Sequence, residues 1–170
     1  KSAILTIQSV NYGNRLQNYA LQTVLERCGN SVESLGREAG FRGSTATKLK
    51  TVKRKLGALG HRGDKLGSFR RFDMQFVAFS KSIVSKEYSS PGLASSYDNF
   101  VIGSDQVWNP DFDFNSELEY LPMVPSEKKI AYAASFGVSE ITENRKKTAE
   151  LLDGIKSISV REAAGANIVH

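Results

Sequence analysis

The sequence predicts an α/β fold, a Rossmann-like parallel sheet with flanking helices. Two observations predict it: strand-like apolar runs alternate with amphipathic helix patterns, and a polar or glycine-bearing turn follows each clear strand at once. Hydrophobic residues make up 40% of the 170 residues, which is enough for the core of one domain of ordinary size. We therefore expect a globular domain built from βαβ units.

The first predicted unit is a strand, a turn and a helix. Residues 3–9 are mostly apolar and predict a buried strand, which ends where asparagine and glycine break the chain at 11–14. Asn14 is the expected helix cap. A helix should follow, because apolar side chains recur at spacings of three and four and predict one buried stripe: Leu16, Tyr19, Ala20, Val24 and Cys28. Residues 31–35 predict a short second strand.

A variable, basic insertion is expected at about residues 36–97. Glycines interrupt residues 36–67, apolar spacing at 49–59 suggests a basic amphipathic helix, and residues 68–79 predict a helix with a phenylalanine edge. Phenylalanines at helical spacing are more typical of a core than of a base-stacking surface. The net charge of +5 comes largely from this stretch, which holds Lys48, Lys50, Lys53, Arg54, Lys55, Arg62, Lys65, Arg70 and Arg71.

Regular alternation returns at residue 98. Strands are predicted at 98–103, 130–135 and 158–160, a helix at 143–155, and a last helix from Arg161. The turns after these strands carry Ser104, Asp105, Gln106, Ser135 and Arg161. Because the carboxyl ends of parallel strands share one edge of a sheet, we expect these side chains to gather with those of residues 11–14 along the edge where open α/β sheets bind ligands.

Several common chemistries lack their sequence signature. Neither G-x-G-x-x-G nor G-x-x-x-x-G-K-[ST] occurs, so nicotinamide or ATP binding has no central support, and no G-x-S-x-G marks an acyl-transfer nucleophile. The two histidines, His61 and His170, have no Cys or His at ligand spacing, so no metal site is expected. One cysteine and no apolar run of roughly 20 residues favour a cytoplasmic protein without a transmembrane segment.

Four motifs then resemble one family, the polysaccharide pyruvyl transferases. Asn11–Gln22, with the sequence NYGNRLQNYALQ, resembles the opening motif of the family, and Gly103–Pro110, GSDQVWNP, resembles its central motif. YAASFG at 132–137 and SVRE at 159–162 are similar to two more, in the same order. The chain is therefore identified as a member of the family, with a resemblance that runs from residue 11 to residue 162.

The resemblance implies a fold, an activity and a missing half. Family members look like GT-B-type enzymes with two Rossmann-like halves, which transfer pyruvate from phosphoenolpyruvate to sugar hydroxyls as a ketal. This chain would then be the amino-terminal domain over 1–170, with the carboxy-terminal domain absent and the isolated fragment inactive. Phosphoenolpyruvate would be the donor substrate, no cofactor would be needed, and a cell-surface or exopolysaccharide sugar would be the acceptor. The oligomeric state stays open.

Within the motifs, two residues are the candidates for catalysis. Arg161 could contact the anionic donor, since arginine suits planar bidentate recognition, or could form a structural salt bridge to Glu162 or Asp105. Asp105 could act as a base or bind a sugar hydroxyl, or its carboxylate could cap a turn. The candidates for substrate binding are Asn11, Tyr12, Gly13, Asn14, Ser104, Gln106, Trp108 and Ser135. Trp108 could stack on a sugar ring or fill the core.

Two other functions remain open on the sequence. A GT-B-like glycosyltransferase would use a nucleotide sugar as donor in the same fold. A non-catalytic module would bind an anionic surface or nucleic acid through the basic stretch, with the steep salt dependence that counterion release produces. We regard nucleic acid as the less favoured partner, because a basic stretch is also found in solvated connections.

Overall fold

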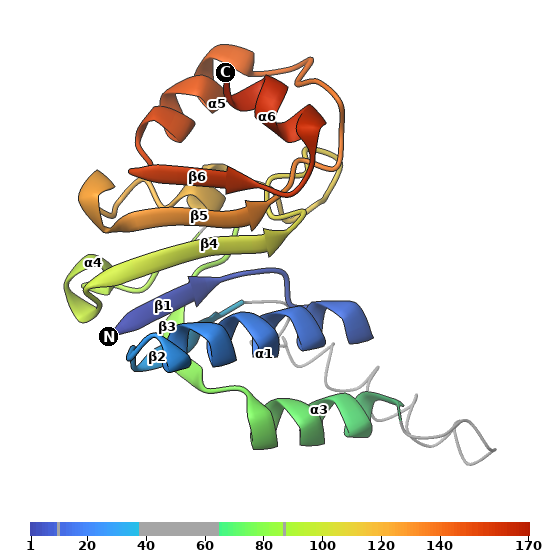
Figure 1. Ribbon diagram of the computed structural model, residues 1–170, viewed down its shortest axis with the longest axis vertical. Helices are drawn as coiled ribbons and strands as arrows, with labels where there is room; N and C mark the ends of the chain where they lie inside the picture. Colours follow the sequence, from blue (N-terminus) through green and yellow to red (C-terminus); the bar gives the residue numbers. More distant parts are fainter. Residues whose placement is uncertain (10, 38–64, 87) are drawn as a thin grey trace, which may run out of the picture.

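The structure of the chain is a computed structural model that describes residues 1–9, 11–37, 65–86 and 88–170. In these residues six parallel strands form one sheet in the order β3-β2-β1-β4-β5-β6, and helices flank it (Figure 1). The strands are β1 (Ser2–Leu5), β2 (Val32–Gly36), β3 (Phe79–Ile83), β4 (Asn99–Asp105), β5 (Lys129–Ala134) and β6 (Ser157–Val160). The predicted Rossmann-like α/β fold is confirmed.

Helices and short 3-10 turns connect the strands. The helices are α1 (Tyr12–Arg27), α3 (Lys65–Phe76), α4 (Leu93–Ser96), α5 (Arg145–Asp153) and α6 (Ala163–Val169). Two 3-10 turns, η1 (Glu117–Tyr120) and η2 (Ser126–Lys128), lie in the long connection from β4 to β5. The arrowheads of β1, β4, β5 and β6 point to the same side of the molecule, where the polar turns therefore gather (Figure 1).

The strand order creates a switch point between β1 and β4. The chain moves outward from β1 to β2 and β3, then returns to pair β4 with β1 and moves outward in the opposite direction to β5 and β6. The connections that follow β1 and β4 therefore diverge. In open α/β sheets the crevice at the carboxyl ends of such strands is the usual ligand site.

The core lies on both faces of the sheet. Alternate side chains of β1 point to opposite faces, so that Ala3 and Leu5 join the larger apolar cluster and Ile4 joins the smaller one beneath α1. The larger cluster also contains Trp108 from the β4–β5 connection and Leu152 from α5. Strands covered on both faces read as continuous apolar runs, which is why β1 and β4 were predicted from sequence.

The predicted buried stripe of α1 is wrong. The helix turns polar residues toward the sheet, burying Asn14, Asn18 and Gln22, while Leu16 and Val24 are 56% and 51% exposed and Cys28 is also exposed. The buried amides have partners: the Ser34 hydroxyl donates to Asn18 Oδ1 at 2.9 Å, and the Ala78 amide donates to Gln22 Oε1 at 2.9 Å. Hydrogen bonding across the interface therefore outweighs the apolar spacing.

The predicted insertion is the second region in which the structure differs from the prediction made from the sequence. The helix expected at 68–79 is α3 at Lys65–Phe76, and the unpredicted strand β3 begins at Phe79 and pairs with β2. Phe69 is buried, whereas Phe76 and Phe79 are 40% and 43% exposed, so only part of the phenylalanine edge is core. Arg70 and Arg71 lie on α3, and the basic residues from Lys48 to Arg62 lie outside the described residues.

Candidate functional site

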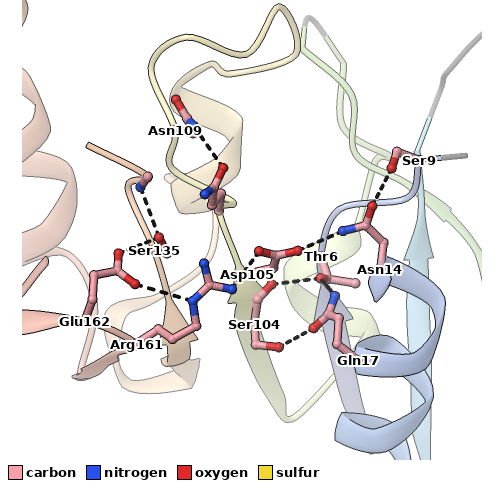
Figure 2. A network of polar contacts seen from close by, with 12 residues as sticks. Thr6, Ser9, Asn14, Gln17, Ser104, Asp105, Asn109, Ser135, Arg161 and Glu162 are labelled. Carbon is pink, nitrogen blue, oxygen red and sulfur yellow. Dashed lines mark hydrogen bonds and ion pairs between the residues drawn. The ribbon is translucent and has the colours of Figure 1, made fainter. Parts of the chain in front are cut away.

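Asp105, the last residue of β4, is the centre of a polar network at the switch point (Figure 2). Its carboxylate accepts a hydrogen bond from Asn14 Nδ2 at 2.8 Å through Oδ2 and one from Arg161 Nη1 at 2.8 Å through Oδ1. Its backbone has a φ of 77°, and its carbonyl accepts from the amides of Val107 and Ser135. One carboxylate thus joins the first turn of α1 to the end of β6.

Arg161 stands at the exposed side of this network. Its side chain is 47% exposed, against 25% for that of Asp105, and its Nε also lies 3.4 Å from Glu162 Oε2. Both salt bridges considered from the sequence are therefore formed. A guanidinium placed by two carboxylates and open to solvent can still offer N–H donors to an anion, because it carries five donors in a fixed fork.

Asn14 is held on the opposite side of Asp105. The Ser9 hydroxyl donates to Asn14 Oδ1, which leaves the amide nitrogen pointing at the aspartate (Figure 2). The predicted capping role belongs to another residue: Asn11 is the N-cap of α1, and its side chain accepts from the Gly13 amide at 2.7 Å. Asn14 is therefore available to orient Asp105 because Asn11 satisfies the helix end.

A second set of hydrogen bonds, among Thr6, Gln17 and Ser104, holds the end of β4 in place. Ser104 contacts Gln17 Oε1 through its hydroxyl, its carbonyl accepts from Thr6 Oγ1 at 3.1 Å, and Gln17 Nε2 donates to the same threonine oxygen at 2.6 Å. Neither Thr6 nor Gln17 was predicted from the sequence to lie at the site. Gln17 lies inside the opening motif, one helical turn after Asn14, and that spacing was the available signal.

Gln106 and Ser135 belong to the turns on the β5 side. Asn109 Nδ2 donates to Gln106 Oε1 at 3.1 Å, and both side chains pack close to Gly137. Ser135 is fully buried, donates to Glu162 Oε1 and accepts from the Gly137 amide at 3.0 Å. Its position indicates that Ser135 holds the turn after β5.

Trp108 takes the core role of the two that the sequence left open. Its side chain is 1% exposed, its ring stacks on Tyr120 with centroids 5.2 Å apart, and its Nε1 donates to the Glu119 carbonyl at 3.4 Å. A ring enclosed in this way offers no face to a sugar in this structure. Trp108 and Ser135 are both buried and therefore present no side-chain surface to a ligand in this structure.

Tyr12 and Gly13 form the first turn of α1 and lie at the rim of the network. The Tyr12 side chain is 58% exposed and its ring meets Phe69 of α3 edge to face, with centroids 4.6 Å apart. Gly13 contributes its amide to the cap made by Asn11. These contacts show a structural role for both residues, and their predicted contact with substrate stays a prediction.

A hollow of about 410 Å³ opens beside the network. We call it the switch-point hollow, and it is lined by Ile7, Ser9, Asn11, Asn14, Asp105, Gln106, Phe112 and Phe114. Four of the ten residues predicted from sequence line it: Asn11, Asn14, Asp105 and Gln106. Arg161 adjoins the hollow through its ion pair with Asp105. Its volume falls within the range of small-molecule sites, and its walls combine apolar rings with a few polar groups, as such sites usually do.

The comparison with protein families agrees with the motifs. The family model described as polysaccharide pyruvyl transferase matches residues 11–170. The chain belongs to the polysaccharide pyruvyl transferase family. The match covers α1, which carries Asn14, and every strand from β2 to β6. Searches of curated proteins and of solved structures each found no significant match to this family member.

Two further properties bear on the kind of site. Within the described ranges, His, Cys, Asp and Glu side chains do not form a group of three that could hold a metal ion. Among the helices that the structure describes, none has the length and apolar character needed to cross a membrane.

Proposed function

We propose that the protein takes part in moving a pyruvyl group from phosphoenolpyruvate to hydroxyls of a polysaccharide sugar, as a ketal. The observation that carries this proposal is the Asn14–Asp105–Arg161 array beside the switch-point hollow, in a chain of the polysaccharide pyruvyl transferase family. A GT-B arrangement, with a second Rossmann-like half closing over this edge, would complete the site, and the protein would act in the cytoplasm.

The proposed reaction needs an anion site and two proton transfers. One phosphoenolpyruvate and two sugar hydroxyls give one ketal and one phosphate: the bond from C2 to the phosphate oxygen breaks, and two bonds from C2 to sugar oxygens form. The two sugar hydroxyls release two protons. One is matched by the proton that converts the methylene carbon into a methyl group, and the other is taken up by the departing phosphate. Protonation of the methylene develops positive charge at C2, so donor orientation and hydroxyl deprotonation are the tasks for the protein.

Arg161 is the residue we assign to the donor anion. Its half-exposed guanidinium beside the hollow can pair with the carboxylate or phosphate of the donor. Asp105 holds that guanidinium in place and is itself held by Asn14, so we assign it first the role of orienting Arg161. Asn11 and Gln106, which line the same hollow, supply amide groups to the bound substrates.

The test of this function is phosphate release. A protein that joins this chain to the proposed second half should release inorganic phosphate from phosphoenolpyruvate in the presence of an acceptor polysaccharide. Arg161→Lys in that protein should raise the donor KM by about tenfold or more, because a point charge replaces a bidentate fork. Arg27→Ala, at an exposed arginine at the far end of α1, is the matched control and should leave the KM unchanged. An absence of phosphate release across a broad panel of acceptors would overturn the proposal.

Donor binding separates this function from its nearest alternative. A glycosyltransferase of the same fold would be stabilised against heat by a nucleotide sugar and not by phosphoenolpyruvate. We expect phosphoenolpyruvate to raise the melting temperature and Arg161→Lys to reduce the shift. A shift caused by a nucleotide sugar alone would assign the hollow to a different donor.

A further inference from the structure

A second hollow opens beside the switch-point hollow. It has a volume of about 280 Å³, and we call it the outer hollow. Ile7 and Phe114 give it apolar walls, and its polar lining includes Gln8, Arg37, Lys86 and Asp113. Ile7, Ser9 and Phe114 line both hollows, so the two share one partition.

The strand order places the two hollows in sequence along the carboxyl edge. Arg161 follows β6, Asp105 ends β4, Ile7 follows β1, and Lys86 follows β3 in the sheet order β3-β2-β1-β4-β5-β6. The ion pair of Arg161 and Asp105 therefore lies on one side of the switch-point hollow, and the outer hollow lies on the other. Phe114 stands between them.

The Phe114 side chain is held in place by contacts with Phe112 and Arg37. Its ring centroid lies 5.1 Å from that of Phe112, and the Arg37 guanidinium carbon lies 5.8 Å from the centre of the Phe114 ring. Arg37 is itself bound to both carboxylate oxygens of Glu119 and donates to the Thr6 carbonyl at 3.1 Å. The ring is half-buried, so that part of its surface remains open.

The charges of the outer hollow suit a neutral ligand. Arg37 is neutralised by its bidentate pair with Glu119, and Asp113 opposes the charge of Lys86. A donor with both a carboxylate and a phosphate is disfavoured there, because the charged side chains of the lining, together with Glu119 bound to Arg37, carry no net positive charge. A sugar ring fits better: its C–H face is apolar and can lie against an aromatic ring, while its hydroxyls can bond to amide, ammonium and carboxylate groups at the edge.

We propose that the outer hollow is the acceptor subsite, in which a neutral sugar ring packs against Phe114. The inference rests on the proposed function, because the transfer brings an acceptor hydroxyl within bonding distance of a donor held beside Arg161. Because Ile7, Ser9 and Phe114 line both hollows, a sugar in the outer hollow would lie next to a donor in the switch-point hollow, and Phe114 would contact the sugar. Phe114 thus takes the sugar-contacting role that the sequence had considered for Trp108.

The test uses defined probes rather than the unidentified polysaccharide. Methyl glycosides of galactose, glucose, mannose and N-acetylglucosamine are titrated separately against the protein and observed by saturation-transfer NMR. At least one should bind, and Phe114→Leu should weaken that binding by about three- to tenfold, because leucine fills the volume but lacks the flat face. Phe114→Tyr should retain it. Phe76→Leu, at an exposed phenylalanine on α3, is the matched control and should have no effect.

The outcomes for sugar and donor are separable. Phosphoenolpyruvate binding should be weakened about tenfold or more in Arg161→Lys and by less than about twofold in Phe114→Leu, because leucine keeps an apolar wall at that position. If phosphoenolpyruvate binds and none of the glycosides does, or if glycoside binding is equal in Phe114→Leu and the parent protein, the acceptor subsite is refuted while the proposed function stands. If a glycoside binds through Phe114 and phosphoenolpyruvate does not bind, the sugar site stands and the donor assignment fails. Thermal unfolding of each variant excludes loss of the fold as the cause.

Discussion

At the residue scale, the site depends on a few side chains whose neighbours are distant in sequence. Asp105 receives one hydrogen bond from Asn14, 91 positions earlier, and another from Arg161, 56 positions later. The turn after β5 passes close to the ends of the Gln106 and Asn109 side chains, and its backbone enters the left-handed region that favours glycine. Gly137 occupies that position, with a φ of 68°.

Gly137→Ala tests how tightly this turn is packed. An added Cβ would lie 2.5 Å from Asn109 Nδ2 and 2.9 Å from the Gln106 side-chain carbon. Both are ends of side chains that can rotate away, so the variant should lose about 1–3 kcal/mol of unfolding free energy in urea, from backbone strain and from the disturbed Asn109–Gln106 hydrogen bond. Gly29→Ala is the matched control: its φ is also positive, at 84°, but no described atom lies within 4 Å of the added Cβ, and it should lose only about 1 kcal/mol. Equal losses would contradict the close packing.

At the element scale, α1 shows that the apolar spacing of a helix does not always mark its buried face. Asn18 and Gln22 face the sheet, where each has a hydrogen-bond partner from another element, and Leu16 and Val24 face outward. Phe72 and Phe76 of α3 contact Tyr19 and cover part of the outward face. The position of the helix is therefore set by polar contacts that also bring Asn14 to Asp105.

The two faces of α1 predict opposite responses to truncation. Asn18→Ala removes the acceptor of a buried serine hydroxyl and should lower the unfolding free energy by about 1–3 kcal/mol. Leu16→Ala, on the exposed face two residues earlier, should change it by less than about 0.5 kcal/mol. Denaturant unfolding of the two variants side by side measures the difference. A larger loss for Leu16→Ala than for Asn18→Ala would indicate that the apolar face predicted from the sequence is the buried one.

The first residue of β5 predicts a pH dependence of stability. Lys129 is buried, its Nζ donates to the carbonyls of Tyr120 and Leu121, and burial lowers its pKa from the ordinary value of 10.5. Between the lowered pKa and 10.5 the unfolded chain binds more protons than the folded chain, so the contribution of Lys129 to stability rises with pH in that window.

Lys129→Met should remove this dependence. The unfolding free energy of the parent protein minus that of the variant should increase as the pH rises toward 10.5, because only the parent gains from releasing the buried charge. A difference that decreases as the pH rises would refute a lowered pKa for Lys129.

At the scale of the whole molecule, a buried ion pair connects the two sides of the switch point. Arg37 follows β2, Glu119 lies in η1 of the β4–β5 connection, and their side chains are 9% and 0% exposed. The pair is bidentate, with an Arg37 Nη2 to Glu119 Oε2 distance of 2.6 Å. The ion pair fastens the β4–β5 connection to the sheet. Because Phe112 and Phe114 lie on that connection and line the hollows, the pair also keeps the walls of both hollows in place.

Glu119→Ala should accordingly be one of the most destabilising single substitutions. Removing one partner leaves the Arg37 charge buried without compensation, and we expect a loss of about 3–5 kcal/mol in the unfolding free energy. Glu117 lies two residues before Glu119 in the same 3-10 turn and forms an exposed ion pair with Lys147. Glu117→Ala breaks that pair and should lower the unfolding free energy by less than about 1 kcal/mol. Thermal and denaturant unfolding measure both, and comparable losses would show that the Arg37 pair is not buried in solution.

The sequence by itself determined the alternation of strands and helices, the fold class and the edge at which polar residues gather. These follow from local patterns, since the spacing of apolar residues and the position of asparagine, glycine and serine depend on a few neighbours along the chain. The family resemblance across residues 11–162 came from the same local motifs, and the family match over residues 11–170 confirmed it.

Only the tertiary structure decided which face of α1 is buried, that Trp108 packs on Tyr120, and which side chains meet at Asp105. The edge strand β3 also escaped prediction, because it is short and only partly buried, and its pairing with β2 gives it its place. The physical reason is the same in each case. Spacing along a chain reports where side chains point relative to one another, whereas burial and hydrogen bonding depend on partners that the fold brings from far away in sequence.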